Sequence, residues 1–384
     1  MAYNFDEIVN RRNTESYKWD IKENELPMWV ADMDFKAAPE IMEALSNKLN
    51  QGVFGYAIVP DEWYDAYISW WQRRHGYIMK KEWLMFCTGV IPAISSTVRK
   101  LTTPAEKVVI QTPVYNNFFN SVINNGRFVL ENKLIYKDGK YEMDFCDLEK
   151  KLSDPQTTLM ILCNPHNPVG KIWSKEELLK VGELCKKYHV NVLSDEIHCD
   201  ITDPGKSYIP FASVSDTCRE ISVTAIAPTK TFNIAGLQTS AISVPDEALR
   251  NRVNRGINTD EVAEPNSFAV DAAIAAFEKG EKWLDELRDY IYNNKMIVKQ
   301  YFKENLKDIT LIESEATYLL WLDCSKTGMD STRLAADIRR KTGLILSPGG
   351  IYGGDGDSFL RFNIASPRGM LEDGLKRLGQ YFNK

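Results

Sequence analysis

The sequence predicts an α/β fold in which helices cover a mainly parallel sheet and the C-terminal third forms a second lobe. From about residue 40 to 245, short apolar runs alternate with helical patterns, the order of elements found in such sheets. Several of these runs are apolar almost throughout, as strands buried on both faces are. After about residue 246 the pattern turns helical for some sixty residues, and it alternates again from Ile309.

Runs rich in Val, Ile or Leu and flanked by polar or turn residues predict the strands of the sheet. They lie at residues 83–87, 107–111, 159–163, 190–194, 221–226 and 239–244. Residues 61–74 predict a helix that begins near Pro60 and ends at Gly76. Its apolar stripe contains Trp63, Tyr67, Ile68 and Trp71, which core packing accounts for.

The C-terminal part predicts a helix capped by Ser331, then a glycine-rich loop and a last strand near residues 359–364. We expect the N-terminal segment to join this lobe. The predicted division is an N-terminal segment of residues 1–45 that contributes to the small domain, a large domain of residues 46–280, and a small α+β domain of residues 281–384. The glycine-rich loop at residues 349–356 lacks the strand and helix that a dinucleotide-binding loop requires.

Composition narrows the classes of partner. The 384 residues carry a formal net charge of -6 and contain no marked run of Lys and Arg, which argues against a nucleic-acid-binding surface. The seven cysteines form no C-x-x-C pair and no Cys/His cluster at zinc spacing, so we expect a reduced, cytoplasmic protein without a metal. We find neither an export signal nor an apolar run long enough for a membrane span.

The motif NPHNPVG at residues 164–170 follows one predicted strand, where α/β proteins place ligand-binding loops. Its Asn167 offers a neutral amide that can donate a hydrogen bond to an oxygen anion. A rigid turn is an equally good interpretation of this motif taken alone.

Asp195 ends another apolar strand, in the motif VLSDEIH at residues 192–198. A carboxylate that is buried there needs a partner, because burying an unpaired charge costs several kcal/mol. A cation held by Asp195 is the functional interpretation. A helix cap or an ion pair with a core Arg is the structural one.

Lys230 lies in the motif APTKTFNIAG at residues 227–236, within an otherwise uncharged stretch that follows a further strand. Desolvation lowers the pKa of a lysine and makes the amine a usable nucleophile for a carbonyl. A surface loop lysine would be the preferred interpretation if this motif stood alone.

Asn167, Asp195 and Lys230 therefore follow in order at three strand ends, and this arrangement resembles the fold type I pyridoxal-phosphate (PLP) enzymes, the aspartate aminotransferase superfamily. The resemblance implies a PLP-dependent transferase-like fold whose large, PLP-binding domain holds a mainly parallel seven-stranded sheet. It implies that Asn167 binds the phenolic oxygen of PLP, that Asp195 pairs with the pyridinium nitrogen, and that Lys230 forms the Schiff base. An anionic Asp keeps the ring nitrogen protonated, so that the ring can accept electrons.

Further positions match the superfamily. Tyr115 corresponds to the residue that stacks on the PLP ring, and Val90 and Ile91 begin a helix that resembles the phosphate cradle. Tyr56 resembles a residue that reaches the cofactor of the neighbouring subunit, which implies a homodimer with shared sites. Arg361 matches the residue that grips the substrate α-carboxylate, together with Asn167, a role that suits a guanidinium fork.

Three positions depart from the aspartate aminotransferase pattern and put the phosphate ligands in doubt. His198 stands where many aminotransferases have a Tyr that touches the phenolic oxygen, and we expect it to contact the cofactor. Ala227 replaces a phosphate-binding Ser, and Gln238 stands where some members have a phosphate-binding Arg. The Thr229 hydroxyl is the substitute ligand that we expect.

A narrower resemblance lies at residues 4–20, 27–35 and 230–237, which look like the MalY/PatB group of cystathionine β-lyase-like C–S lyases. It implies α,β-elimination of L-cystathionine or cysteine S-conjugates to thiol, pyruvate and ammonia, with Lys230 removing the α proton. A thiol, with a pKa of ~8.5, leaves far more readily than an alkoxide does. Two alternatives stay open: a class I/II aminotransferase with the same cofactor, and a regulatory protein that binds a transcription factor.

Overall fold

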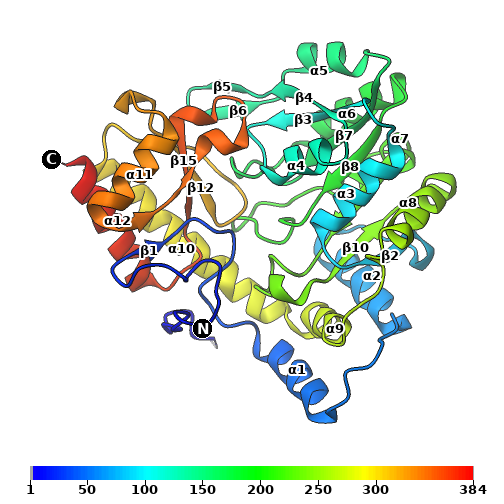
Figure 1. The fold of residues 1–384 in the computed structure, drawn as a ribbon, viewed down its shortest axis with the longest axis horizontal. Coiled ribbons are helices and arrows are strands. Elements are labelled where there is room, and N and C mark those ends of the chain that lie inside the picture. The colour runs from blue at the N-terminus through cyan, green and yellow to red at the C-terminus, as the bar shows by residue number, and fades with distance from the viewer. Residues whose placement is uncertain (1–2, 384) are drawn as a thin grey trace.

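The computed structural model describes residues 3–383, and its centre is a seven-stranded sheet (Figure 1). The strand order is β2-β10-β9-β8-β7-β3-β4, and β10 runs antiparallel to both of its neighbours while the other pairs are parallel. The strands are β2 Leu84–Cys87, β3 Lys107–Thr112, β4 Phe128–Lys133, β7 Thr157–Cys163, β8 Asn191–Asp195, β9 Ser222–Ile226 and β10 Ser240–Ser243. The predicted α/β sheet is confirmed, whereas β4 was not predicted because its second half, Glu131, Asn132 and Lys133, is polar.

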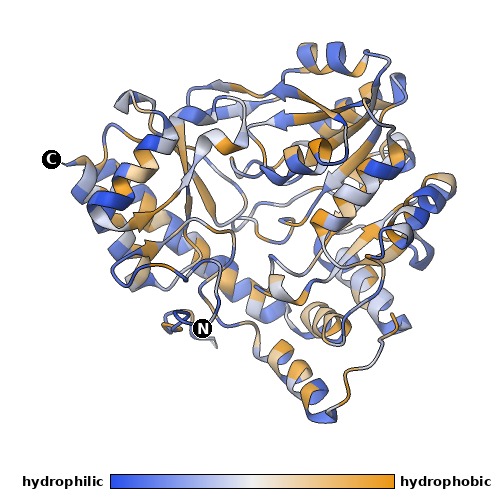
Figure 2. Cartoon of the chain, viewed as in Figure 1, coloured by the Kyte–Doolittle hydropathy of each residue, from blue (hydrophilic) through white to orange (hydrophobic). Residues whose placement is uncertain are grey.

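Helices cover both faces of this sheet, and alternate residues of one strand pack toward opposite faces. In β7, Leu159 and Ile161 join one apolar cluster, while Met160 and Leu162 join the other. This is why the strand reads as an unbroken apolar run, as the orange central strands of Figure 2 illustrate. The helices are α3 Val90–Leu101, α4 Asn117–Ile123 and α8 Glu247–Thr259 on the first side, with α5 Phe145–Leu152, α6 Lys175–Lys187 and α7 Asp216–Glu220 on the second.

A second lobe is built on the four-stranded antiparallel sheet β11-β12-β15-β14. Its strands are β11 Thr310–Leu311, β12 Leu319–Asp323, β14 Ser347–Pro348 and β15 Phe359–Asn363. The long helix α10 (Glu281–Asn305), α11 (Ser331–Thr342) and α12 (Arg368–Phe382) lie beside it (Figure 1). The N-terminal segment reaches this lobe, because β1 (Leu26–Pro27) pairs in parallel with β13 (Leu344–Ile345). The division at residues 45 and 280 stays a prediction.

The remaining helices pack in one aromatic cluster. They are α1 Pro39–Gln51, α2 Asp61–His75 and α9 Ala269–Lys279. The helix predicted at residues 61–74 is confirmed as α2, and it ends at Gly76, whose φ of 63° is left-handed. Trp63, Tyr67 and Trp71 are buried, whereas Ile68 is half-buried.

One predicted helix cap is wrong. The N-cap of α11 is Asp330, whose side chain accepts a hydrogen bond from Arg333 N, and Ser331 is the first helical residue. The Ser331 hydroxyl instead accepts a hydrogen bond from Gly350 N at 2.9 Å. In the described residues, no helix is long and apolar enough to cross a membrane.

Candidate active site

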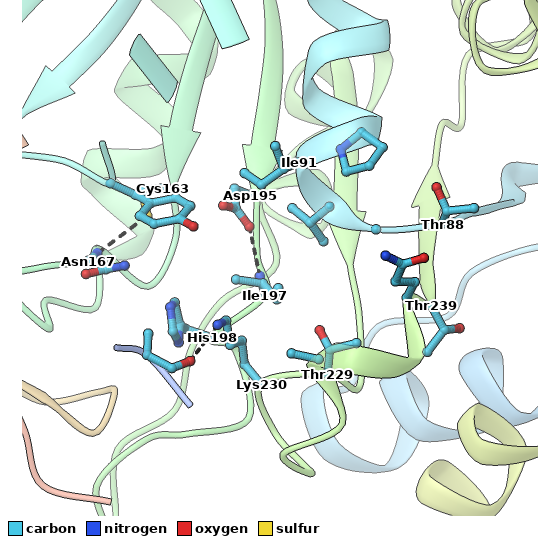
Figure 3. Close-up of a pocket in the computed structure, with 17 residues that line it drawn as sticks. Thr88, Ile91, Cys163, Asn167, Asp195, Ile197, His198, Thr229, Lys230 and Thr239 are labelled. Atoms are coloured by element: carbon cyan, nitrogen blue, oxygen red, sulfur yellow. Dashed lines mark hydrogen bonds between the residues drawn. The ribbon is translucent and has the colours of Figure 1, made fainter. Parts of the chain in front are cut away.

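A cavity of about 250 Å³ opens where the carboxyl ends of β7 and β8 meet the loop that follows β9. Figure 3 shows side chains from these three chain segments facing it. Most of the residues predicted for the site line it: Val90, Ile91, Tyr115, Asn167, Asp195, His198, Thr229 and Lys230. Parallel strands bring distant parts of the chain to one edge of a sheet, so these residues converge although the sequence separates them widely.

Asp195 and Lys230 supply opposite charges to this cavity. Asp195 is 3% exposed, and burial raises the pKa of its carboxyl to about 7. Its Oδ1 accepts a hydrogen bond from Ile197 N at 3.1 Å (Figure 3). Burial, together with the positive charge of Arg361, lowers the pKa of the Lys230 amine to about 8, while Asp32 and Asp195 raise it. A large fraction of this amine is therefore neutral near pH 8.

Arg361 lies on β15 and is 5% exposed. It is not one of the residues that line the cavity, but it contacts Asn167, which is. Its Nη1 donates to Asn167 Oδ1 at 3.3 Å, and its Nη2 donates to Trp29 O at 3.0 Å. Its Nε is buried and has no hydrogen-bond partner in the described part of the chain. The guanidinium also lies over the ring of Tyr352, 4.9 Å from the ring centroid. A planar cation with an unused donor beside a cavity can bind a carboxylate.

The N-terminus of α3 forms another part of the cavity wall. The helix begins at Val90, and Gly89 precedes it as the N-cap. Backbone N–H groups without partners in the first helical turn suit a phosphate dianion. Thr88, Thr229 and Gln238 add neutral polar side chains to this part of the lining.

Tyr115 and His198 present rings to the cavity. The Tyr115 hydroxyl accepts a hydrogen bond from Asn117 Nδ2 at 2.8 Å. His198 is 3% exposed, and its buried Nδ1 has no hydrogen-bond partner among residues 3–383. Burial, followed by the charges of Lys230 and Arg361, lowers the pKa of this imidazole to about 3, so the ring is neutral.

Tyr56 does not line the cavity of its own chain. It lies between α1 and α2, and its relative exposure is 104%. The residues beside it are also exposed: Val53, Phe54 and Ile58.

Sequence reasoning missed several residues of the cavity wall, including Ala31, Thr88, Ile197, Ala235 and Thr239. Thr88 could have been found, since it directly precedes the glycine that caps α3. Ala31 could not, because it is an apolar residue far from the strand ends in sequence and contributes a backbone carbonyl. Cys163 is 2% exposed and also lines the cavity.

A second polar cluster lies away from the cavity. The candidate ligand atoms of His75, Cys199 and Asp200 all lie within 4.8 Å of one another. The Asp200 carboxylate already accepts hydrogen bonds from Trp70 Nε1 and Thr231 Oγ1, at 3.0 and 3.1 Å, and it contacts His75 Nε2 at 3.0 Å. Because Thr231 is the neighbour of Lys230, this carboxylate anchors the lysine loop.

Comparisons with known proteins agree with this geometry. Residues 25–378 match the family described as Aminotransferase class I and II. The chain is 46% identical to the cystathionine beta-lyase PatB of Bacillus subtilis (strain 168) and 31% identical to the protein MalY of Escherichia coli (strain K12), with 98% of both chains covered in each comparison. The crystal structure of cystalysin from Treponema denticola, which contains pyridoxal 5'-phosphate, superposes with a TM-score of 0.97 at 33% identity, covering 100% of this chain and 99% of that one. The chain therefore belongs to the class I and II aminotransferase family and has its type I fold.

Proposed function

We propose that this protein is a PLP-dependent C–S β-lyase that converts L-cystathionine or cysteine S-conjugates to a thiol, pyruvate and ammonia. The observation that carries the proposal is the meeting of the Lys230 amine, the Asp195 carboxylate and the Asn167 amide at one cavity. The similarity to PatB supports a lyase over other reactions of the family. The substrate is a small amino acid, as in the family as a whole.

The cavity fits PLP in its chemistry. Asp195 would face the ring nitrogen, and the charge on that nitrogen would stabilise the carboxylate form that burial alone disfavours. The unpartnered Nδ1 of His198 and the amide of Asn167 would face the phenolic oxygen. Tyr115 would stack on the ring, and the amides of Val90 and Ile91 with the Thr229 hydroxyl would hold the phosphate. When bound, PLP supplies a conjugated system that accepts the electrons of the broken Cα–H bond.

Lys230 would bond covalently to the cofactor at rest and act as the base when substrate replaces it. With a pKa lowered to about 8, its amine is a base near neutral pH and its conjugate acid can protonate the departing sulfur. Arg361 and Asn167 would hold the substrate carboxylate, which fixes the Cα–H bond relative to Lys230.

The exposed segment that contains Tyr56 supports a homodimer with shared active sites. Three further apolar residues within three positions of this tyrosine in sequence are also exposed, by 73% for Val53, 53% for Phe54 and 80% for Ile58. Apolar groups gathered in this way mark an interface. We place Tyr56 at the phosphate of the partner subunit's cofactor, and we place the protein in the cytoplasm, where its seven free thiols would stay reduced.

Incubation of the PLP-loaded protein with L-cystathionine, without any keto acid, tests the reaction. We expect pyruvate and free homocysteine thiol in equal amounts. Product that forms only when a keto-acid acceptor is added would contradict the lyase and support the aminotransferase that the family name favours. Sedimentation of the same preparation tests the dimer.

A further inference from the structure

Residues 29–35, which we call the strap, pass beside the cavity without forming a helix or strand, and Ala31 lines the cavity. Carbonyl groups outside regular structure need other hydrogen-bond partners when they are buried. Side chains supply them here. Six of the seven strap carbonyls accept side-chain hydrogen bonds, those of Trp29, Val30, Ala31, Asp32, Met33 and Phe35.

Both cations of the candidate active site donate to the strap. Lys230 Nζ donates to Ala31 O at 2.6 Å, and Arg361 Nη2 donates to Trp29 O at 3.0 Å. The Tyr318 hydroxyl also donates to Ala31 O, at 3.1 Å. The strap therefore contacts both the Lys230 amine and the Arg361 guanidinium.

Asn233, three residues after Lys230, ties the strap to the lysine loop. Its Oδ1 accepts a hydrogen bond from Met33 N at 2.9 Å, and its Nδ2 donates to Met33 O at 3.1 Å and to Phe35 O at 2.8 Å. The Asn233 backbone has a φ of 57°, in the left-handed region that Asn tolerates better than most residues. One side chain thus sets the distance between the strap and Lys230.

A buried charge cluster holds the other side of the strap. Lys18 Nζ donates to Asp34 Oδ2 at 2.7 Å, and these two side chains are 1% and 3% exposed. Arg11 donates to Asp34 and to Asp32, at 2.9 and 2.6 Å, and Trp19 Nε1 donates to Asp34 at 2.7 Å. Breaking a buried pair of this kind costs several kcal/mol, so the cluster stabilises the strap at Asp32 and Asp34.

We infer that the strap is a positioning element for proton transfer: the Ala31 carbonyl holds the Lys230 amine while that amine is free, and Asn233 fixes the carbonyl. The inference rests on the proposed role of Lys230 as the base. A neutral amine has two hydrogens and one lone pair, so donating one hydrogen to a fixed acceptor restricts where the lone pair points. The Cα–H bond breaks, an N–H bond forms on Lys230, and the electron pair stays with the substrate. In the elimination, sulfur then leaves with the C–S pair and receives the proton from Lys230.

The pH dependence distinguishes this role from a merely structural one. Charged or titratable groups of four residues face Lys230, namely Arg361, Asp32, Asp195 and His198. A carbonyl accepts a stronger hydrogen bond from an ammonium than from an amine, so the Ala31 contact favours the protonated lysine. Loosening the hydrogen bond between Lys230 and the Ala31 carbonyl should therefore have two effects at once. It should lower the pKa of Lys230, and it should slow proton transfer.

The test uses PLP-loaded Asn233→Gly, because glycine keeps the left-handed backbone without strain and removes all three side-chain bonds. We expect deuterium exchange at Cα of L-alanine in D2O, followed by NMR, to fall about tenfold at saturation. The acidic limb of the pH profile of this exchange rate should move to lower pH. The affinity for PLP, measured by absorbance titration, should stay within about twofold of the wild type. A wild-type exchange rate, with the acidic limb of the pH profile at the wild-type position, would overturn the inference.

Ser347→Ala is the matched control, since it removes one side-chain bond to the strap at Trp29 O, 3.1 Å away on the side of Arg361. We expect it to raise KM and to leave saturated exchange and its pH limb unchanged. Tyr318→Phe removes a single hydrogen bond to the Ala31 carbonyl. It tests the positioning role if Asn233→Gly fails to fold or to bind PLP. It should slow exchange about threefold, and an unchanged rate would refute the positioning role.

Exchange at Cα needs no C–S cleavage, so the two proposals fail separately. A wild-type protein that exchanges the α hydrogen but releases no thiol from cystathionine ends the lyase proposal and leaves the strap testable. A wild-type protein that cleaves cystathionine while Asn233→Gly and Tyr318→Phe exchange normally ends the strap proposal alone.

Discussion

The two walls of the cavity are built in different ways. One wall consists of residues at strand ends, such as Asn167 and Asp195, whose positions follow from the sheet itself. The other is the strap, which reaches Lys230 across 199 positions of sequence and Arg361 across 332. The first wall presents side chains chosen for their chemistry, whereas the second presents backbone oxygens that other side chains hold in place. Function can thus depend on residues whose own side chains carry no chemistry.

Replacing Lys230 tests the strand-end wall most severely. Lys230→Ala removes both the proposed covalent anchor and the proposed base, so we expect kcat to fall by at least about a thousandfold. Pyruvate release from cystathionine measures this loss, and circular dichroism checks that the fold is intact. Turnover close to that of the wild type would mean that another residue is the base.

Replacing Asp34 tests the anchorage of the other wall. Asp34→Asn leaves Lys18 buried with a weaker partner, and we expect the free energy of unfolding to fall by about 3 kcal/mol. Lys36→Gln is the control, because its pair with Glu7 is exposed and should contribute less than about 1 kcal/mol. Denaturant titration of both variants gives the comparison, and equal losses would show that burial of the cluster is not what matters.

Arg361 connects the two walls, since it donates hydrogen bonds to Asn167 and to the strap. Arg361→Lys keeps the charge but loses the planar fork, so we expect KM to rise about tenfold or more with a smaller change in kcat. A thioether amine that lacks the carboxylate should be used equally poorly by both proteins. A variant that loses kcat at unchanged KM would remove Arg361 from substrate binding.

The proposed role of Lys230 as the base determines the pH profile that we expect for kcat. Its pKa is lowered to about 8, and only the neutral amine accepts a proton, so activity should rise with pH and level off above about 8. At pH 7 about one tenth of the amine is neutral, which predicts roughly a tenfold lower rate than the plateau. A flat profile between pH 6 and 9 would exclude this amine as the titrating base.

We expect the smallest effect from replacing a helix cap outside the cavity. Ser174 and Glu177 form a capping box at the start of α6, and Ser174→Ala should cost about 1 kcal/mol of stability with kcat unchanged. Thermal unfolding and cystathionine turnover measure the two quantities. A loss of activity would show that this helix is coupled to the cavity.

The sequence was sufficient for the parts of the site that combine a strand signal with a polar residue at its end. Asp195 and Lys230 were found in this way, and the structure brings them to one cavity. Tyr56 stays a prediction, because its partner is another copy of the chain. The contact of Ala31 with Lys230 could not be predicted, since any residue offers a carbonyl and only the three-dimensional path of the chain decides which one is used.

The prediction of secondary structure failed where polar residues interrupt an apolar run or offer two possible helix caps. The strand β4 lies at the sheet edge, and its apolar run ends after three residues because Glu131, Asn132 and Lys133 are polar. The cap of α11 was misplaced by one residue, since Asp330 and Ser331 are both good capping residues and sequence alone does not separate them.

The cysteines give a practical handle. All seven are free, six of them are buried, and Cys146 on α5 is exposed. A maleimide dye should therefore label the native protein at one position, on a helix that covers the sheet and lies apart from the cavity lining. Fluorescence from that position could report on assembly and unfolding without any engineered thiol.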